Sequence, residues 1–378
     1  MISRQLLNLL SKVCVTMIAK DAPRVLMCGT LSISGGVSAH SLNLYNELKK
    51  LNLIIYFFNY SGKDINSLSD SKWRRLYKRT LGLFLFILIH RSEFNLLHIQ
   101  ASGGLFSFLS AINGALISKL FSIDLVVTFH YSQTESFLAK YKKIFSFVLR
   151  NSKNFLVVSN RQRNLIASSF PEFSNKIFVI PNGFNSEYFH PMDSLTCKKL
   201  LKLPENKKII LNISNLISTK GHKNLISAIK LVSNTNTNII CIIVGRGNLE
   251  NELKTQIETL GLSNFVILAG WRPDVEIPLW INACDIFVLP SLAEGNPIVM
   301  FECLGCGKPF LGTKVGGIPE IISSDNIGLL VDAGDINNLC NNILISIEKD
   351  WSRELISGYG SNFSWNIIAK KMKEIYEG

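Results

Sequence analysis

Two glutamates, Glu294 and Glu302, stand at the two ends of a turn that is predicted to open a helix. A Gly-Asn-Pro step ends the preceding apolar run, and proline fits the first helical position, where its missing N–H costs nothing. The free N–H groups of this first turn can face a diphosphate, which the positive end of the helix dipole also favours. The residues expected to form the turn are Asn296, Pro297, Ile298 and Val299.

Carboxylates accept hydrogen bonds from hydroxyl groups, so Glu294 is expected to bind a sugar and Glu302 a ribose. The alternative is that both are solvated surface charges, the commonest place for a glutamate. Their context favours the first interpretation, because 288–291 has the pattern of a strand end and 308–313 that of the next strand. In open α/β sheets, ligands bind beyond the carboxyl ends of the strands.

Strand-like apolar runs alternate with helical patterns along the whole chain, which predicts parallel sheets in an α/β protein. At 378 residues the chain is long for one domain and sufficient for two. Strands are expected at 24–29, 53–58, 95–100, 124–129, 154–158 and 176–180, and then at 208–214, 239–244, 264–268, 285–289, 308–313 and 328–332.

The expected organisation is an amphipathic segment at 1–20, α/β domains at 21–190 and 206–360, a linker at 191–205 and a final helix within 361–378. Ser364 is the candidate cap of that helix.

Glycine-rich turns follow two of the predicted strands. Gly35 and Gly36 leave room for a ligand to approach backbone N–H groups, or they form a tight turn packed on the sheet. Gly245 either turns the chain or borders the ligand. Neither loop has the spacing of a dinucleotide fingerprint, so a Rossmann oxidoreductase fits poorly. Cys303 and Cys306 are expected to pack inside a helix, because no second pair or histidine cluster accompanies them at zinc spacing.

These motifs resemble the retaining family 4 glycosyltransferases of GT-B fold, whose signature is a Glu-x7-Glu element. Glu294 and Glu302 have that spacing, and the element continues into Gly-Gly-Ile-Pro-Glu at 316–320. The resemblance covers nearly the whole chain from about residue 24. Further parts of the family pattern appear in order: Gly35-Gly36, His130, Ser159, Pro181-Asn182-Gly183 and Lys220-Gly221.

The resemblance implies two Rossmann-like domains that face each other across a cleft, with the acceptor side in 21–190 and the donor side in 206–360. The final helix is then expected to cross back to the first domain. The implied reaction moves a sugar from a nucleoside diphosphate sugar, UDP- or GDP-linked, to a hydroxyl with retention at the anomeric carbon. No cofactor is implied, and no metal, since the sequence has no Asp-x-Asp element.

The implied catalytic residues are His130, Lys220 and Glu294, with Lys220 as the charge partner of the leaving diphosphate. Trp271 and Arg272 are expected to border the base. Ser159 and Asn182 are expected on the acceptor side, unless they merely satisfy turns. One position departs from the family pattern: Asn215 stands where the family often has arginine, so one fixed positive charge is missing.

Charge is unevenly shared along the chain. Residues 1–190 hold 22 Lys and Arg against 9 Asp and Glu, while the net charge of the whole chain is +12. Such an excess favours an anionic partner. Residues 70–91, with a basic start and an apolar end, suit a helix in the membrane interface, although a buried helix is the alternative. No aromatic platform motif accompanies the basic cluster, so nucleic acid is not expected.

Together these features predict an enzyme of surface polysaccharide assembly, such as O-antigen, capsule, lipopolysaccharide or exopolysaccharide, acting on a lipid-linked or other glycan acceptor. It is expected to be cytoplasmic and peripheral on the inner face of the plasma membrane. The alternative is a non-catalytic, hydrolase-like or epimerase-like GT-B protein that binds a sugar nucleotide at the membrane surface.

Overall fold

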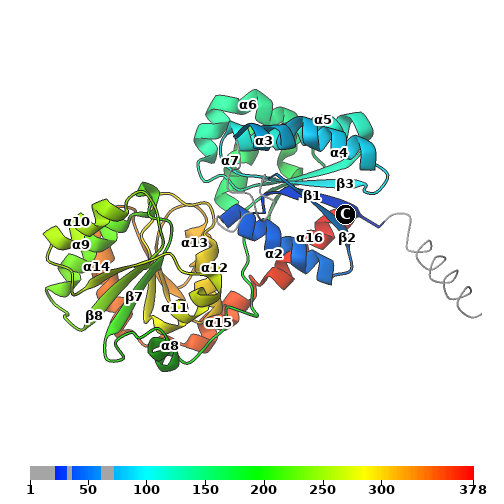
Figure 1. Ribbon diagram of the computed structural model, residues 1–378. Coiled ribbons are helices and arrows are strands. Elements are labelled where there is room, and N and C mark those ends of the chain that lie inside the picture. Colours follow the sequence, from blue (N-terminus) through cyan, green and yellow to red (C-terminus); the bar gives the residue numbers. More distant parts are fainter. Residues whose placement is uncertain (1–21, 32–35, 61–71) are drawn as a thin grey trace, which may run out of the picture.

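The computed structural model describes residues 22–31, 36–60 and 72–378. It contains two lobes, each built on a six-stranded parallel sheet (Figure 1). The strand order is β2-β1-β3-β4-β5-β6 in the first lobe and β12-β11-β10-β7-β8-β9 in the second. The predicted fold class is therefore confirmed. The expected segment 1–20 and Gly35 lie outside the described residues.

All strands lie within two residues of their predicted positions. The first sheet contains β1 (Arg24–Gly29), β2 (Ile54–Asn59), β3 (Leu96–Ala101), β4 (Asp124–Phe129), β5 (Asn154–Val157) and β6 (Ile177–Val179). The second contains β7 (Lys208–Ile213), β8 (Ile239–Val244), β9 (Val266–Gly270), β10 (Ile286–Leu289), β11 (Phe310–Thr313) and β12 (Gly328–Val331). Central strands such as β3 and β8 are buried along their whole length, because helices cover both faces of each sheet.

In the first lobe, α2 (Gly36–Lys50) and α16 (Trp365–Glu377) pack on one face of the sheet. The other face is covered by a helical run and three further helices. The run consists of α3 (Lys72–Tyr77), the π-helical segment η1 (Lys78–Gly82) and α4 (Leu83–His90); the helices are α5 (Leu105–Phe121), α6 (Thr134–Asn151) and α7 (Asn160–Ser169). The short 3-10 segment η2 (Pro171–Lys176) leads into β6.

The second sheet is covered in the same way. One face packs on α9 (His222–Ser233), α10 (Glu250–Thr259) and α14 (Ile336–Glu348). The other packs on α11 (Ile277–Ala283), α12 (Ile298–Gly305), α13 (Ile318–Ile321) and α15 (Arg353–Ser361). Two 3-10 turns, η3 (Ser218–Lys220) and η4 (Asp274–Glu276), complete this lobe.

The segment 191–205, expected as a linker, contains the helix α8 (Ser194–Leu200). The Asp193 carboxylate caps it by accepting a hydrogen bond from the N–H of Thr196. The helix packs against α11 and so lies in the second lobe.

The chain crosses between the lobes twice, and the two crossings lie side by side. Phe184 donates its N–H to Phe363, and Trp365 donates its N–H to Phe184. A Cβ on Gly183 would come within 2.8 Å of the Phe363 oxygen, so only glycine fits there. After the second crossing, α16 returns to the first lobe beside α2 (Figure 1). Ser364 occupies the cap position, but its side chain makes no capping hydrogen bond.

We expect Met372→Ala in α16 to lower the free energy of unfolding by about 2–5 kcal/mol, because the side chain is fully buried in the first lobe. Lys371→Ala, at the exposed neighbouring position, is the control. Chemical denaturation of both variants measures the difference. Equal stability of the two variants would show that α16 does not contribute to the core.

Candidate functional site

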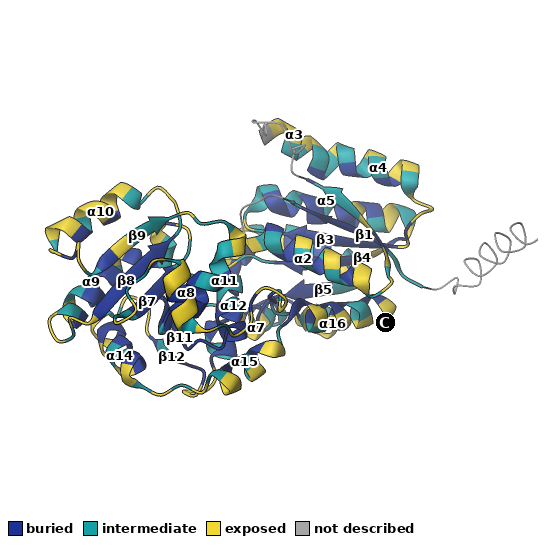
Figure 2. Ribbon diagram, turned by 60° about the horizontal axis from the view of Figure 1, so that its bottom comes forward, coloured by how far each residue is buried: buried dark blue, intermediate teal, exposed yellow. Residues whose placement is uncertain are grey.

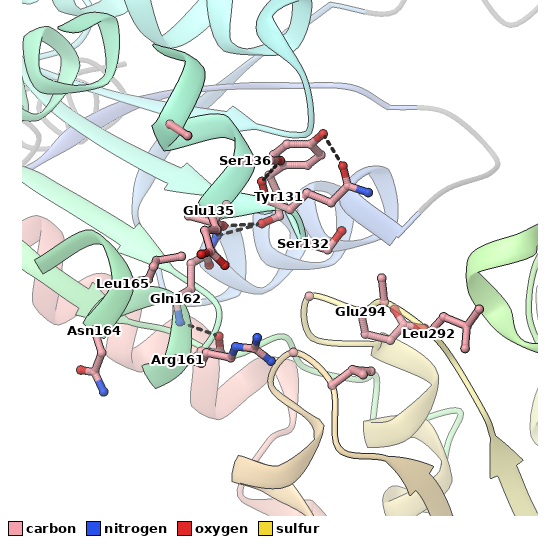
Figure 3. Close-up of a pocket in the computed structure, with 18 of the residues that line it drawn as sticks. Tyr131, Ser132, Glu135, Ser136, Arg161, Gln162, Asn164, Leu165, Leu292 and Glu294 are labelled. Atoms are coloured by element: carbon pink, nitrogen blue, oxygen red, sulfur yellow. Dashed lines mark hydrogen bonds between the residues drawn. The ribbon is translucent and has the colours of Figure 1, made fainter. Parts of the chain in front are cut away.

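A cavity of about 970 Å³ opens between the two lobes (Figure 3). Each segment that lines it follows the carboxyl end of a strand or belongs to the helix after it, as expected for a ligand site in parallel sheets. The first lobe contributes the loop after β4, the start of α6, and α7; the second contributes the loops 292–295 and 315–316. Among the predicted residues, Glu294 and Ser159 line this cavity.

Asn296 joins the two lobes beside the cavity. Its side-chain amide donates to the carbonyl of Val158 at 2.6 Å, and its own carbonyl accepts from the side-chain amide of Asn182 at 2.5 Å. The Asn182 side-chain oxygen is 2.8 Å from Nδ1 of His40. Asn182 thus holds the loop before α12 against the first lobe. The sequence predicted Asn182 on the acceptor side but did not predict this positioning role.

Glu320, the last residue of the Gly-Gly-Ile-Pro-Glu element, makes a second contact between the lobes. Its carboxylate accepts hydrogen bonds from the N–H groups of Asn160 and Arg161 at 2.6 and 2.7 Å. These are free N–H groups at the start of α7, where the helix dipole also favours a negative charge. Ser159 caps the same helix by accepting from the N–H of Gln162.

Lys220 and Glu294, two of the predicted catalytic residues, form an ion pair. Lys220 Nζ lies 2.6 Å from Glu294 Oε1, and the hydroxyl of Ser291 donates to the same oxygen at 2.7 Å. Glu294 is 9% exposed, so this pair is held close and largely away from water. The sequence indicated each residue separately but did not predict their contact or the part of Ser291.

Close packing of two loops explains the position of Lys220. The N–H of Leu292 donates to the carbonyl of Thr219 at 2.7 Å, which ties η3 to the loop that carries Glu294. Gly221 has φ of +71°, and a Cβ there would lie 1.9 Å from the carbonyl oxygen of Pro290. A glycine after the lysine is therefore required for the two loops to meet.

The helix α12 begins at Ile298, with Pro297 at the cap position rather than at the first helical position as predicted. The backbone of Pro297 is extended rather than helical, so the helix begins one residue later than predicted. Ile298 faces Gly36 of the first lobe, since a Cβ on Gly36 would lie 3.9 Å from Ile298 Cδ1. Val299 follows in the first turn and is partly buried. The start of α12 thus lies against the start of α2.

Glu302 lies in the second turn of α12, and its pKa is raised to about 8. Burial is the larger cause, and the negative charge of Asp274 adds to it. At neutral pH most of this carboxyl is therefore protonated in the absence of a ligand. A protonated carboxyl both donates and accepts hydrogen bonds, which is compatible with the predicted contact to ribose hydroxyls.

The Asn215 position is exposed and lies beside the Gly245 loop. The N–H of Leu216 donates to the carbonyl of Arg246 at 3.0 Å, and a Cβ on Gly245 would lie 1.9 Å from the Ser214 oxygen. Gly245 therefore serves the close packing of the two loops.

Two arginines lie over aromatic rings near these loops. Arg246 lies over the exposed ring of Trp271, 5.5 Å from its centroid. Arg272 lies 5.3 Å from the centroid of Trp280. Arg246 therefore lies in the loop after β8, beside the Asn215 loop. Arg272 instead packs on the ring of Trp280 in α11.

His130 ends β4 and belongs to a buried hydrogen-bond network that the sequence did not reveal. Its Nε2 donates to the side-chain oxygen of Gln100 at 2.7 Å, which leaves Nδ1 as the acceptor of the neutral ring. The Gln100 amide contacts Nε2 of His98 at 3.1 Å, and His98 Nδ1 contacts the hydroxyl of Tyr376 at 2.5 Å. The network therefore runs from α16 to the cleft.

His130 and the two histidines beside it are held neutral. Burial lowers the pKa of His98 to about 3 and that of His40 to about 4. Burial also lowers the pKa of His130 well below its ordinary value, and the neighbouring His40 and His98 add to the effect. The His130 and His40 rings lie 4.5 Å apart. His130 is thus fixed in one tautomer and carries no charge at neutral pH.

Several cavity residues were not among the predicted ones. Polar side chains from the first lobe supply most of them, including Tyr131, Glu135, Arg161 and Gln162 (Figure 3). Gln133 also lines the cavity. Their only signal in the sequence is that they follow strands β4 and β5. Within the described ranges, no group of three His, Cys, Asp or Glu side chains is placed to hold a metal ion. Cys303 and Cys306 are both buried and free.

Comparison with known proteins agrees with this geometry. A family model described as Glycosyl transferases group 1 matches residues 196–362. Another, described as Glycosyltransferase Family 4, matches residues 34–188. The UDP-Gal:alpha-D-GlcNAc-diphosphoundecaprenol alpha-1,3-galactosyltransferase of Escherichia coli is 25% identical over 313 residues, which is 77% of either chain. The amylovoran biosynthesis glycosyltransferase AmsK of Erwinia amylovora is 30% identical over 240 residues, which is 60% of this chain and 57% of AmsK.

Solved structures share the two-lobed fold. The crystal structure of Anabaena Alr3699/HepE in complex with UDP has a TM-score of 0.75 at 20% identity, covering 93% of this chain and 99% of that one. At this identity the similarity concerns the fold. With both lobes matched by family models and the Glu-x7-Glu element at the cleft, the chain belongs to the family 4 glycosyltransferases, glycosyl transferases group 1, and has their GT-B fold.

Proposed function

We propose that this glycosyltransferase moves a sugar from a nucleoside diphosphate sugar to a hydroxyl of a lipid-linked saccharide or other surface glycan, with retention at the anomeric carbon. The observation that carries the proposal is the contact of Lys220 with Glu294 at 2.6 Å beside the start of α12. A cation and a carboxylate meet there, and the first N–H groups of α12 follow Glu294 in the same loop, at the carboxyl ends of the strands. Diphosphate and sugar hydroxyls need these three kinds of group.

The charge that develops during the reaction explains the roles. When the bond from the anomeric carbon to the diphosphate breaks, the electron pair leaves with the diphosphate and positive charge develops on the sugar. Lys220 and the N–H groups at the start of α12 stabilise the diphosphate, and preorganised groups of this kind supply most of such catalysis. Glu294 binds sugar hydroxyls, and Glu302 binds the ribose. No metal ion is required in this scheme.

A dedicated base is not part of the proposal. His130 is neutral and its Nε2 proton is engaged by Gln100, so the ring offers an acceptor, Nδ1, rather than a charge. We propose that the acceptor hydroxyl attacks from the face of the leaving group and passes its proton to an oxygen of the departing diphosphate. That route gives retention without a protein nucleophile.

The names of the relatives support the choice of substrates. The Escherichia coli relative is named for a UDP-linked galactose donor and a diphosphoundecaprenol-linked acceptor. Others are named for amylovoran and, putatively, colanic acid biosynthesis. UDP is therefore the first nucleotide to test and GDP the second. The cavity beside Glu294, lined mainly by the first lobe, is the proposed place of the acceptor.

A hydrolase or epimerase of the same architecture is the second candidate. Incubation of the protein with the donor sugar nucleotide distinguishes a transferase from this second candidate. A transferase should release little free sugar without an acceptor and should form product when a lipid-linked or soluble glycan acceptor is added. Equal release of free sugar with and without acceptors would reject the transferase proposal.

Replacing either member of the ion pair should separate binding from transfer. Lys220→Ala removes a charge-assisted contact worth about 1.5–3 kcal/mol, so nucleoside diphosphate affinity should fall roughly tenfold to hundredfold. Glu294→Gln releases Lys220 for the phosphates, so affinity for the nucleotide should stay equal or rise. Transfer should nevertheless fall by roughly two orders of magnitude. Calorimetry with UDP or GDP and a transfer assay measure both quantities, and parallel losses in both variants would contradict the assigned roles.

The raised pKa of Glu302 predicts that the stability of the protein depends on pH. An unfolded chain loses this proton near the ordinary value of 4.5, whereas the folded protein keeps it up to about 8. The free energy of unfolding should therefore fall between these values as pH rises. Glu302→Gln removes this loss, so the variant should match the parent near pH 4.5 and exceed it by a few kcal/mol above pH 8. Thermal unfolding across this range tests it, with exposed Glu354→Gln as control; a constant difference would contradict it.

A further inference from the structure

The run of α3, η1 and α4 has a buried face and an apolar exposed face. Leu83 and Ile87 are fully buried in the first lobe, whereas Trp73 is 79% exposed and Ile89 is 74% exposed. Tyr77, Leu81, Leu85 and Leu88 lie between them and are also exposed. Figure 2 shows the run at the edge of the lobe, with exposed residues along it. We call these six exposed residues, together with Leu116 and Leu120 of α5, the apolar strip.

The π-helical turn keeps the apolar strip in line. Most residues of the strip in this run are four positions apart, from Trp73 to Ile89. In an ordinary α-helix, with 3.6 residues per turn, side chains at this spacing would drift around the helix axis. The π turn accommodates an additional residue, so the outward residues before and after it stay on one side. Its carbonyl groups have partners in α5: the Asn113 amide donates to the carbonyls of Arg79 and Thr80 at 3.2 and 2.8 Å. The wide turn is therefore stabilised by a specific contact.

The helix α5 extends the apolar strip. Leu116 and Leu120 are 45% and 65% exposed. They follow Asn113 by three and seven residues, so they lie on the side of α5 that faces the run. Phe121 packs against Phe84 of α4, with ring centroids 5.9 Å apart, which brings the end of α5 beside α4. The exposed apolar residues of the two elements therefore form one surface.

Charge around the apolar strip is mainly positive, with Glu93, which pairs with His90, at the end of the run. Residues 72–92 and 101–123 contain seven Lys or Arg and no Asp or Glu. Arg74, Arg91 and Lys119 are exposed. Trp73 and Tyr77 stand at the basic end of the run, and these two residue types favour the boundary between lipid and water. An apolar surface with mainly cationic neighbours complements anionic lipid better than a protein surface of mixed charge.

We propose that the apolar strip docks the first lobe on an anionic lipid bilayer, with the helical run lying in the headgroup region. The run is about 28 Å long, which suits a helix parallel to the membrane. Within the described ranges, no helix is long and apolar enough to span a bilayer. The proposal extends the proposed function and rests on it for the lipid-linked acceptor, because docking would hold the acceptor side of the cleft at the membrane where that substrate resides.

Flotation with vesicles of phosphatidylcholine, with and without phosphatidylglycerol, tests the docking. The full chain should bind the anionic vesicles, more weakly at high salt. Trp73→Ser and Ile89→Ser should each lower the partition coefficient by roughly tenfold. Val275→Ser is the matched control, since Val275 is also 74% exposed but lies in the second lobe. Lys119→Glu should weaken binding, and Lys371→Glu in α16, on the opposite face of the sheet, should weaken it less.

Nucleotide binding by the same proteins shows whether they are folded and separates this proposal from the proposed function. If UDP or GDP stabilises every variant and none of them differs from the parent on vesicles, docking is rejected and the donor site stands. If vesicle binding follows the predicted order and no nucleotide binds, the donor site is rejected and docking stands.

Two further results would replace the membrane with another occupant. A dimer of the parent that Ile89→Ser dissociates, without vesicle binding, would assign the apolar strip to a second copy of the chain. Vesicle binding that appears only after residues 1–20 are removed would assign it to that segment. Either result overturns docking of the full chain.

Discussion

The site depends on the hydrogen bonds that Asn296 makes between the lobes. This residue follows the loop of Glu294 and precedes the helix α12, so its position fixes both. Its amide donates to the end of β5, and its carbonyl accepts from Asn182, which is itself held by His40. These groups are buried, and a buried polar group left without its partner costs free energy. The second lobe is therefore held in register with the first beside the cavity.

The same region shows how the two halves of the chain share the chemistry. The second lobe supplies the charged pair Lys220 and Glu294. The first supplies His130, held uncharged by burial, and both charged and neutral cavity side chains such as Glu135, Arg161 and Gln162. The ion pair lies at the proposed diphosphate site, and the opposite wall of the cleft offers charged and neutral hydrogen-bonding groups. A hydroxyl nucleophile needs orientation more than it needs a strong base when the leaving group accepts the proton.

Strand positions and the two-lobed fold could be predicted from the sequence, because buried parallel strands are continuous apolar runs such as β8. Glu294, Glu302 and Lys220 could be proposed from spacing and family resemblance. The cluster in which Lys220 and Ser291 both contact Glu294 could not, since it depends on how η3 packs against a loop some seventy residues later. The network of Tyr376, His98, Gln100 and His130 was hidden for the same reason. The sequence also suggested a basic end and an apolar end for 70–91, whereas the π turn creates an apolar strip along its length.

The paired crossings at Phe184 and Phe363–Trp365 determine how the lobes can move. A single strand of chain between two domains permits rotation about several axes. Two strands tied by hydrogen bonds in both directions resist twisting and leave bending about one axis as the easy motion. Any opening of the cleft about that axis would separate the carboxylate of Glu320 from the start of α7 and would also break the hydrogen bonds of Asn296. Such a constraint would preserve the alignment of the two halves during that movement.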